Sequence, residues 1–345
     1  MTEPRDSCPT IAVLGVGRIG RMHAELIAHQ VPGLALMSVF DVHQPAAVSV
    51  AEDLGVIAAS SVEEVLASDV DAVAVCSSTD THVDLVVAAA EAGKAIFLEK
   101  PVSLNLAEVD RAVAAVEASG VLVQVGFNRR FDDSHAAVQQ AVANGQVGDV
   151  HMVRITSRDP EPPPVEYVKV SGGIFLDMTI HDFDMARFVT GSEVTEVYAK
   201  AAVRVDPAIG EAGDVDTAVI VLTHESGAIT TIDNSRQAVY GYDQRVEVFG
   251  SAGVARSQNP FSHTAVVQNA DGLSGATIPY FFLDRYIPSY LAEWTSFLEG
   301  MESGTTPVSI GDGRAPLVIG LAAWKSFREN RPVATAEITA DDRGL

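Results

Sequence analysis

One short stretch of the sequence ends an apolar run in residues that could act on a substrate. "FLEKPVSLN" (97–105) places a carboxylate, an ammonium and a proline directly after the run, at Glu99, Lys100 and Pro101. Pro101 restricts the backbone of Lys100 to an extended conformation. A lysine at a strand end can donate a hydrogen bond to a reacting hydroxyl or carbonyl. The alternative is a surface Lys–Glu pair, because such pairs are common and energetically minor.

A second stretch combines a carboxylate with an imidazole. "GGIFLDMTIHDFDMARF" (172–188) has helical apolar spacing, and Asp177 and His181 lie four residues apart, hence on one helical face. A carboxylate one turn from an imidazole can fix its tautomer and raise its basicity, as a general base requires. Two alternatives remain: an acid of the first helical turn beside a partly buried histidine, or a metal pair. Metal is disfavoured, because a third ligand such as His151 has no supporting spacing.

A glycine motif follows the first apolar run. "GVGRIG" permits a tight turn, a close approach of the backbone to a pyrophosphate, and close packing of a helix on a sheet. Asp41 lies 21 residues after Gly20, where an acid that binds a ribose hydroxyl is expected. The alternative is a glycine-rich turn with an incidental Asp. The predicted coenzyme-binding residues here are Gly15, Gly17, Arg18, Ile19, Gly20 and Asp41.

Asp41 also predicts which nucleotide binds. A carboxylate accepts hydrogen bonds from ribose hydroxyls and repels a 2′-phosphate, whereas an NADP site favours a nearby arginine. Val42, His43 and Gln44 follow, and none is an arginine. NAD is therefore favoured, although His43 leaves NADP open.

Further polar residues follow the next two apolar runs. Ligands of parallel sheets lie beyond the carboxyl ends of the strands. This placement predicts that the coenzyme contacts Ser77, Ser78, His82, Glu99 and Lys100. Thr81 reads equally well as a helix N-cap, and His82 as a surface residue of the first helical turn.

The elements that must position these residues change in character along the chain. Up to residue 127, continuous apolar strands alternate with amphipathic helices, which indicates a doubly wound parallel sheet covered on both faces. Beyond it, longer alternating strands with hairpin turns indicate an α+β domain with a large open, mostly antiparallel sheet. The predicted strands of this second part are 151–158, 193–205, 215–237 and 244–258, and its helices are 133–148, 172–188, 288–301 and 313–330.

Length and composition fit two globular domains. The chain has 345 residues, 47% of them hydrophobic, and a net charge of −23 that repels nucleic acid and anionic membranes. Two cysteines cannot build a disulfide framework or a Cys-rich metal site. No apolar stretch is long enough to span a bilayer, and the N-terminal residues have no secretory pattern, so we expect a cytoplasmic protein.

These motifs together resemble the glucose–fructose oxidoreductase, inositol dehydrogenase and rhizopine-catabolism (Gfo/Idh/MocA) family of oxidoreductases. The resemblance runs from "IAVLGVGRIGRMHAE" through "FLEKPVS" and "VGFNRRFD" to "SGGIFLDMTIHDFDMARF". It implies a Rossmann domain at 1–127 and a substrate-binding and oligomerisation domain at 128–310. It also implies that a C-terminal helix and tail at 311–345 pack back near the Rossmann domain, and that the protein is a homotetramer packed through its C-terminal sheets.

The resemblance also implies roles for individual residues. Lys100 matches the family's catalytic lysine, Asp177 its substrate-binding acid and His181 its general base. Residues expected to line the substrate pocket are Asn128, Arg129, Ser157, Arg158, Asp159, Asp177, His181 and Tyr240.

The implied activity is the NAD-dependent oxidation of a cyclitol, with bacterial inositol dehydrogenases as the most similar members. A dehydrogenase for scyllo-inositol or for an aldose is the alternative within the family. From another class, a non-catalytic dinucleotide sensor has the same fold but does not need Lys100, Asp177 and His181, all of which are present.

Overall fold

The computed structural model describes residues 8–345, which divide into two compact units. The first comprises the chain up to Phe127 together with Tyr290–Arg314, and the second comprises Asn128–Ser289 together with Ala315–Leu345. This corrects two of the expected boundaries. Residues 290–310 fall in the first unit rather than in the second, and residues 315–345 fall in the second unit.

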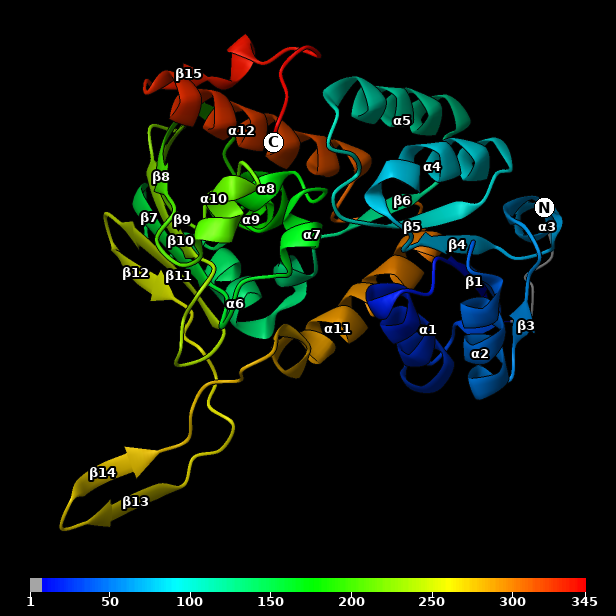
Figure 1. Ribbon diagram of the computed structural model, residues 1–345, viewed down its shortest axis with the longest axis horizontal. Coiled ribbons are helices and arrows are strands. Elements are labelled where there is room, and N and C mark those ends of the chain that lie inside the picture. The colour runs from blue at the N-terminus through cyan, green and yellow to red at the C-terminus, as the bar shows by residue number, and fades with distance from the viewer. Residues whose placement is uncertain (1–7) are drawn as a thin grey trace. The chain divides into compact units, whose positions relative to one another are not determined.

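The first unit is a doubly wound parallel sheet of six strands in the order β3-β2-β1-β4-β5-β6. Its four inner strands β1, β4, β5 and β2 are mostly buried and largely apolar, as a sheet covered on both faces requires, whereas the edge strand β3 is partly exposed. Figure 1 shows α1 and α2 on one face of this sheet and α4 and α5 on the other. The strands are β1 Thr10–Leu14, β2 Ala35–Phe40, β3 Ile57–Ala58, β4 Ala72–Val75, β5 Ala95–Glu99 and β6 Val123–Gly126. The helices are α1 Arg18–Gln30, α2 Gln44–Leu54, α3 Val62–Ala67, α4 His82–Glu91 and α5 Leu106–Ser119.

The C-terminal helix α11 (Phe282–Ser303) completes the core of the first unit. Its residues Trp294 and Phe297 are fully buried and belong to the same apolar cluster as Phe97 of β5. The indole of Trp294 stacks on the Phe97 ring with the centroids 4.3 Å apart. Helix α11, nearly two hundred residues later in the sequence, therefore packs against β5, the strand that ends just before Lys100.

The second unit contains a seven-stranded sheet in the order β12-β11-β7-β10-β9-β8-β15. All its neighbouring pairs are antiparallel except β10 and β7, which run parallel, so the predicted mostly antiparallel sheet is confirmed. The strands are β7 Val150–Arg158, β8 Val194–Ala202, β9 Thr217–His224, β10 Ile229–Ser235, β11 Asp243–Gly250, β12 Gly253–Arg256 and β15 Val333–Ala334.

Helices cover one face of this sheet, as Figure 1 shows for α6, α9 and α12. The helices of the second unit are α6 Asp133–Ala143, α7 Val165–Val168, α8 Gly173–Asp177, α9 Ile180–Thr190 and α10 Pro207–Glu211. The unit also contains the part of α11 that ends at Ser289 and the part of α12 (Ile310–Glu329) that begins at Ala315. A separate hairpin, β13 Val266–Asn269 with β14 Gly272–Gly275, projects from the unit with all its residues exposed.

The prediction of one helix over 172–188 was wrong. Helix α8 ends at Asp177 and α9 begins at Ile180, with the break at Met178 and Thr179. The hydroxyl of Thr179 donates to the side chain of Asn234 at 2.7 Å, and the main-chain nitrogen of Thr179 donates to the carbonyl of Ile174 at 2.8 Å. The bond to Asn234 of β10 holds Thr179 at the break between the two helices. Asp177 and His181 therefore belong to two helices rather than to one face of a single helix.

Candidate active site

The glycine motif forms the turn between β1 and α1. Gly15 has φ +92°, and a side chain there would collide with the backbone of Ser77 at 2.5 Å. A Cβ on Gly20 would lie 1.9 Å from the carbonyl oxygen of Gly15, which explains the close packing of α1. A Cβ on Gly17 would meet nothing within 4 Å. The backbone in front of the helix N-terminus is thus open at the one glycine expected to approach the pyrophosphate.

The N-terminus of α1 can receive an anion. Gly17 is the N-cap, no side chain caps the helix, and its first turn carries no acidic residue. Uncapped amides at a helix N-terminus favour phosphate through their N–H groups and the helix dipole. Arg18 is exposed at this end and Ile19 half-buried. These residues fit the diphosphate of a dinucleotide.

Asp41, at the end of β2, holds the glycine turn in place. Its carboxylate accepts hydrogen bonds from the main-chain nitrogen of Val16 at 2.8 Å and from that of His43 at 2.8 Å. Each oxygen has a second lone pair, so the carboxylate keeps the capacity to accept ribose hydroxyls. The ribose-binding role stays a prediction, and the contacts with Val16 and His43 give Asp41 a structural role as well.

His82 differs from its expected role as a coenzyme contact. The ring is 1% exposed, with Nδ1 2.9 Å from the carbonyl oxygen of Pro101 and Nε2 3.1 Å from that of Ser77. Burial lowers the pKa of His82. Both ring nitrogens are thus directed at main-chain carbonyls, and His82 ties the loop after β4 to the loop after β5.

The residues around His82 remain near the strand ends. Ser77 is half-buried, and its hydroxyl lies 2.6 Å from that of Thr81. Ser78 is exposed. Thr81 occupies the N-cap position of α4 without a side-chain capping bond. Ser77 and Ser78 thus follow the carboxyl end of β4, as expected, and their contact with the coenzyme stays a prediction.

Glu99 also differs from its expected role as a coenzyme contact. It is 8% exposed, and both carboxylate oxygens are engaged within the first unit. Oε1 lies 2.7 Å from Nε2 of His23, and Oε2 accepts from the main-chain nitrogen of Lys100 at 3.1 Å. Lys100 is half-buried and is followed by a cis peptide bond to Pro101. Glu99 thus anchors the residue after it.

In the second unit, Asp177 is held by two side chains that the sequence analysis missed. Its Oδ1 accepts from the hydroxyl of Tyr167 at 2.8 Å, and its Oδ2 lies 3.1 Å from Nη1 of Arg236. Arg236, just past β10, is 1% exposed and its Nη2 lies 3.8 Å from Oδ2 of Asp214. Asp214 in turn accepts from the main-chain nitrogen of Ile174 at 3.0 Å. Arg236 and Asp214 therefore brace both ends of α8.

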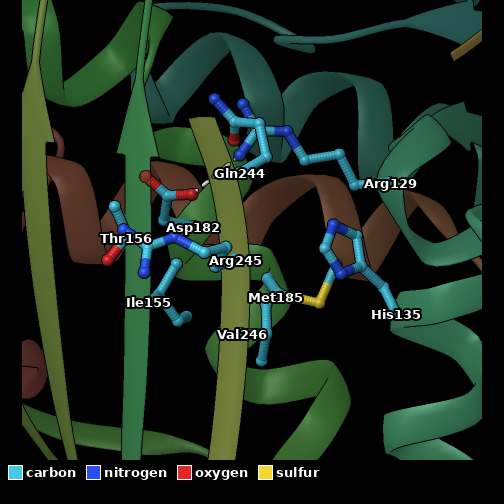
Figure 2. A pocket seen from close by; sticks show the side chains of 9 residues that line it. All are labelled: Arg129, His135, Ile155, Thr156, Asp182, Met185, Gln244, Arg245 and Val246. Atoms are coloured by element: carbon cyan, nitrogen blue, oxygen red, sulfur yellow. Dashed lines mark hydrogen bonds and ion pairs between the residues drawn. The ribbon is translucent and has the colours of Figure 1, made fainter. Parts of the chain in front are cut away.

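Arg129 is part of a buried network rather than of an open pocket. Its Nη1 donates to Asp182 at 2.8 Å and to Ser157 at 3.0 Å, and its Nη2 donates to Tyr242 at 3.3 Å. Figure 2 shows Arg129 and Asp182 extending toward each other. Only 7% of the Arg129 side chain is exposed, and both guanidinium nitrogens named above are engaged within the second unit.

Other predicted substrate residues lie nearer the surface of the second unit. Arg158, at the end of β7, donates to Asp233 and, at 3.0 Å, to the hydroxyl of the exposed Tyr240. Burial raises the pKa of the half-buried Asp159 to about 6. His181, in the first turn of α9, is also half-buried.

Asn128 is a predicted substrate residue that the structure buries. Its amide nitrogen has no hydrogen-bond partner among the described residues. A buried donor in this state is costly, so an acceptor from a ligand or water would stabilise it.

No motif in the sequence marks most of the residues that hold the predicted site residues in place. His23, Tyr167 and Arg236 contact Glu99 or Asp177 directly. Trp294 acts through His23, and Asp214 acts through Arg236 and Ile174. Only His23 offered a local signal, since it is a polar residue on the buried face of α1.

The described residues meet neither the requirements of a metal site nor those of a membrane-spanning helix. Among residues 8–345, no group of His, Cys, Asp and Glu side chains has a geometry suited to a metal ion. None of the helices in that part of the chain has the length and apolar character to cross a membrane. The cytoplasmic location expected from the sequence stays a prediction.

Two family models match the chain. The model described as an oxidoreductase family with an NAD-binding Rossmann fold matches residues 10–127, and the model of the GFO/IDH/MocA C-terminal domain matches residues 135–256. The first match confirms the predicted coenzyme, and the two together confirm the predicted fold class.

Known proteins resemble nearly the whole chain. A myo-inositol 2-dehydrogenase of Thermotoga maritima is 50% identical over 95% of this chain and 99% of its own. The crystal structure of a myo-inositol dehydrogenase from Corynebacterium glutamicum is 39% identical over 95% of this chain and 99% of its own, with a TM-score of 0.91. A scyllo-inositol dehydrogenase from Lactobacillus casei, solved with NAD(H) and scyllo-inositol bound, is 28% identical over 96% of this chain and 100% of its own, with a TM-score of 0.89.

The glycine turn in front of α1, the lysine at the end of β5 and these full-length similarities lead to one assignment: the chain belongs to the GFO/IDH/MocA family of NAD-binding oxidoreductases.

Proposed function

We propose that the protein is an NAD-dependent inositol 2-dehydrogenase that oxidises a secondary ring hydroxyl of myo-inositol to the ketone. The observation that carries the proposal is the 50% identity over almost the whole chain to a myo-inositol 2-dehydrogenase. The open backbone at Gly17 and the uncapped N-terminus of α1 support it, because they suit a dinucleotide. The presence of Lys100, Asp177 and His181 supports it further.

Each of these residues has a distinct role in the proposed reaction. When bound, NAD supplies the oxidised nicotinamide ring that takes up hydride from the carbinol carbon. His181 accepts the hydroxyl proton, and Lys100 donates a hydrogen bond to the reacting oxygen. Asp177, fixed by Tyr167 and Arg236, supports the imidazolium that forms.

Specificity among polyols is the second part of the proposal. A relative solved with scyllo-inositol bound makes that cyclitol the nearest alternative substrate, followed by an aldose. Arg158, Asp159 and Tyr240 are the residues we assign to this choice, with Asn128 as a further substrate contact. Their polar groups suit a polyhydroxylated ring, since a site built to hydrogen-bond hydroxyls rejects analogues that lack them.

The test is spectrophotometric. The purified protein is given NAD and, in turn, myo-inositol, scyllo-inositol and glucose, and formation of NADH is followed by absorbance. We expect the highest kcat/KM with myo-inositol, and the same series with NADP measures the coenzyme preference. Binding of NAD without oxidation of any of the polyols would contradict the proposal and favour a dinucleotide sensor.

We propose a homotetramer that packs through the outer faces of the seven-stranded sheets. Four apolar side chains form a row across adjacent strands, because Phe249 pairs in register with Val254 and Met152, and Met152 with Ile229. They are 43–49% exposed. A contiguous apolar row on one side of a sheet is typical of an interface. Light scattering of Phe249→Asp should give a smaller species than the unsubstituted protein, whereas Ile57→Asp, at an exposed apolar position of β3, should not.

A further inference from the structure

A chain of hydrogen bonds runs behind Lys100 inside the first unit. The indole nitrogen of Trp294 donates to Nδ1 of His23 at 3.0 Å, and Nε2 of His23 lies 2.7 Å from Oε1 of Glu99. The other carboxylate oxygen, Oε2, accepts from the main-chain nitrogen of Lys100 at 3.1 Å. Trp294 and His23 are fully buried, so water does not compete with these bonds.

The chemistry of the indole fixes the tautomer of His23. An indole N–H can only donate, so Nδ1 of His23 must be the unprotonated, accepting nitrogen. The proton of the neutral ring then lies on Nε2, which donates it to Glu99. A second proton on Nδ1 would place two N–H groups against each other in a dry interior, at the cost of two unsatisfied donors. His23 is thereby held as the neutral Nε2–H form.

His23 and Glu99 are surrounded by aromatic rings and by three further ionisable groups. The rings of Phe97, Tyr290 and Trp294 pack edge-on against the imidazole, at centroid distances of 5.1–5.5 Å. The charge of Glu99 also acts on the ionisable groups of Cys76, His82 and Glu293.

The groups around Glu99 favour their neutral forms. Burial and the charge of Glu99 raise the pKa of Glu293. Burial likewise raises the pKa of the Cys76 thiol and lowers that of His82. Glu99 is the carboxylate of this cluster whose two oxygens are engaged by His23 and by the main chain of Lys100.

We propose that His23 and Trp294 are positioning residues for Lys100: together they fix the Glu99 carboxylate, which anchors the main chain from which the lysine side chain extends. The consequence for turnover rests on the proposed function, because it requires Lys100 to act on the substrate oxygen. The anchoring itself does not rest on it. A displaced lysine would lose the geometry for its hydrogen bond, and errors of about 1 Å in such groups cost on the order of 10²-fold in rate.

Two substitutions of His23 separate donor loss from packing loss. In His23→Gln the side-chain amide nitrogen can replace Nε2 as the donor to Glu99, whereas His23→Leu fills similar space without a donor. With lysine labelled with ¹⁵N, exchange of the Lys100 amide should be as slow in His23→Gln as in the unsubstituted protein and roughly tenfold faster in His23→Leu. Equal exchange in all three proteins would overturn the proposal, whether or not the enzyme oxidises inositol.

Kinetics with myo-inositol then test the consequence. His23→Leu should lower kcat on the order of 10- to 100-fold, with the Kd for NADH changed by less than about threefold, and His23→Gln should recover most of the loss. A His23→Leu protein with unchanged kcat would overturn the link to turnover. If no polyol is oxidised even by the unsubstituted protein, the proposed function fails, and the exchange measurement still decides the anchoring.

Substitution of Trp294 tests the tautomer. In Trp294→Phe the donor to Nδ1 is lost, so the indole no longer dictates which ring nitrogen of His23 carries the proton. ¹⁵N NMR of labelled histidine should show the Nε2–H tautomer of His23 in the unsubstituted protein, and a share of rings with the proton on Nδ1 in Trp294→Phe. The matched control is Phe297→Leu, which disturbs the same aromatic cluster without removing a hydrogen bond and should leave the Nε2–H tautomer in place. Proton on Nδ1 in the unsubstituted protein would overturn the proposal.

Discussion

The guanidinium of Arg236 lies 3.1 Å from the carboxylate of Asp177, on a side chain that is almost completely buried. The same guanidinium lies 3.8 Å from Asp214, which holds the first turn of α8 through the main-chain nitrogen of Ile174. One arginine thus links the carboxylate proposed to support the catalytic base with the start of the helix that carries it.

Substitution of Arg236 should therefore affect both stability and rate. Arg236→Met leaves Asp177 and Asp214 without their buried cation, and breaking such a pair costs about 3–5 kcal/mol. We expect kcat/KM for myo-inositol to fall on the order of 10²-fold and Arg236→Lys to keep part of it. Urea denaturation and steady-state kinetics measure the two effects. Arg154→Met, at an exposed pair with Glu247, should cost less than about 1 kcal/mol.

His181→Ala should reduce turnover by on the order of 10²–10⁴-fold, because the proposed proton acceptor is lost. The Kd for NADH, measured by fluorescence titration, should change little. Unchanged turnover would remove His181 from the role of base and leave Lys100 as the candidate.

Two glycines of the same motif should respond in opposite ways. Gly20→Ala places a methyl group 1.9 Å from the carbonyl oxygen of Gly15, so we expect a clear loss of thermal stability. Gly17→Ala meets no protein atom within 4 Å, so the melting temperature should stay close to that of the unsubstituted protein. Its affinity for NAD should nevertheless fall, because the methyl group faces the expected diphosphate. A Gly17→Ala protein with full NAD affinity would contradict this placement of the coenzyme.

The double substitution Asp41→Ser with Val42→Arg should shift the coenzyme preference toward NADP. The first change removes a repelling carboxylate, and the second adds a phosphate partner at a position that is 89% exposed. Asp41 also accepts from Val16 and His43, so some loss of stability accompanies the change. The ratio of kcat/KM with NADP to that with NAD is the measurement, and Val42→Arg alone is the control. An unchanged ratio would contradict the role of Asp41.

Asp159 should make stability depend on pH. Burial raises its pKa to about 6, with Arg236 and Arg129 opposing the shift and Asp177 and Asp182 adding to it. The folded state therefore binds this proton more tightly than the unfolded chain, so the free energy of unfolding falls as pH rises from about 4 to about 6 and is level above.

Asp159→Asn removes this loss. The variant should be more stable than the unsubstituted protein by up to about 3 kcal/mol near pH 7.5 in urea denaturation, and the difference should be small near pH 4. Asp271→Asn, at an exposed carboxylate, should show no such difference. A gain at pH 4 as large as that at pH 7.5 would contradict the raised pKa.

Much of the first unit is predictable from sequence because its signals are local. Five of its six strands lie in segments dominated by apolar residues, and the three glycines of the motif all lie within residues 15–20. The partners of Glu99 are not local. His23 lies 76 residues away from it, and Trp294 lies 271 residues from His23, so no spacing rule connects the three.

The second unit shows where periodicity fails. The apolar spacing of 172–188 is helical throughout, yet the bond from Thr179 to Asn234 interrupts the helix. Turn signals predict hairpins between consecutive strands, and β9 and β10 do pair in that way. The parallel pairing of β10 with β7 joins strands more than seventy residues apart and depends on the sheet as a whole.

Because Tyr290–Arg314 belongs to the first unit, the coenzyme-binding unit is not one continuous segment of the chain, which matters for producing it as a fragment. A fragment that stops at Phe127 would include every strand of the parallel sheet but would leave Phe97 without Trp294 and Phe297 against it. Such a fragment should aggregate or remain partly folded. A coenzyme-binding fragment that behaves well in isolation will need the later helix spliced back by a designed linker.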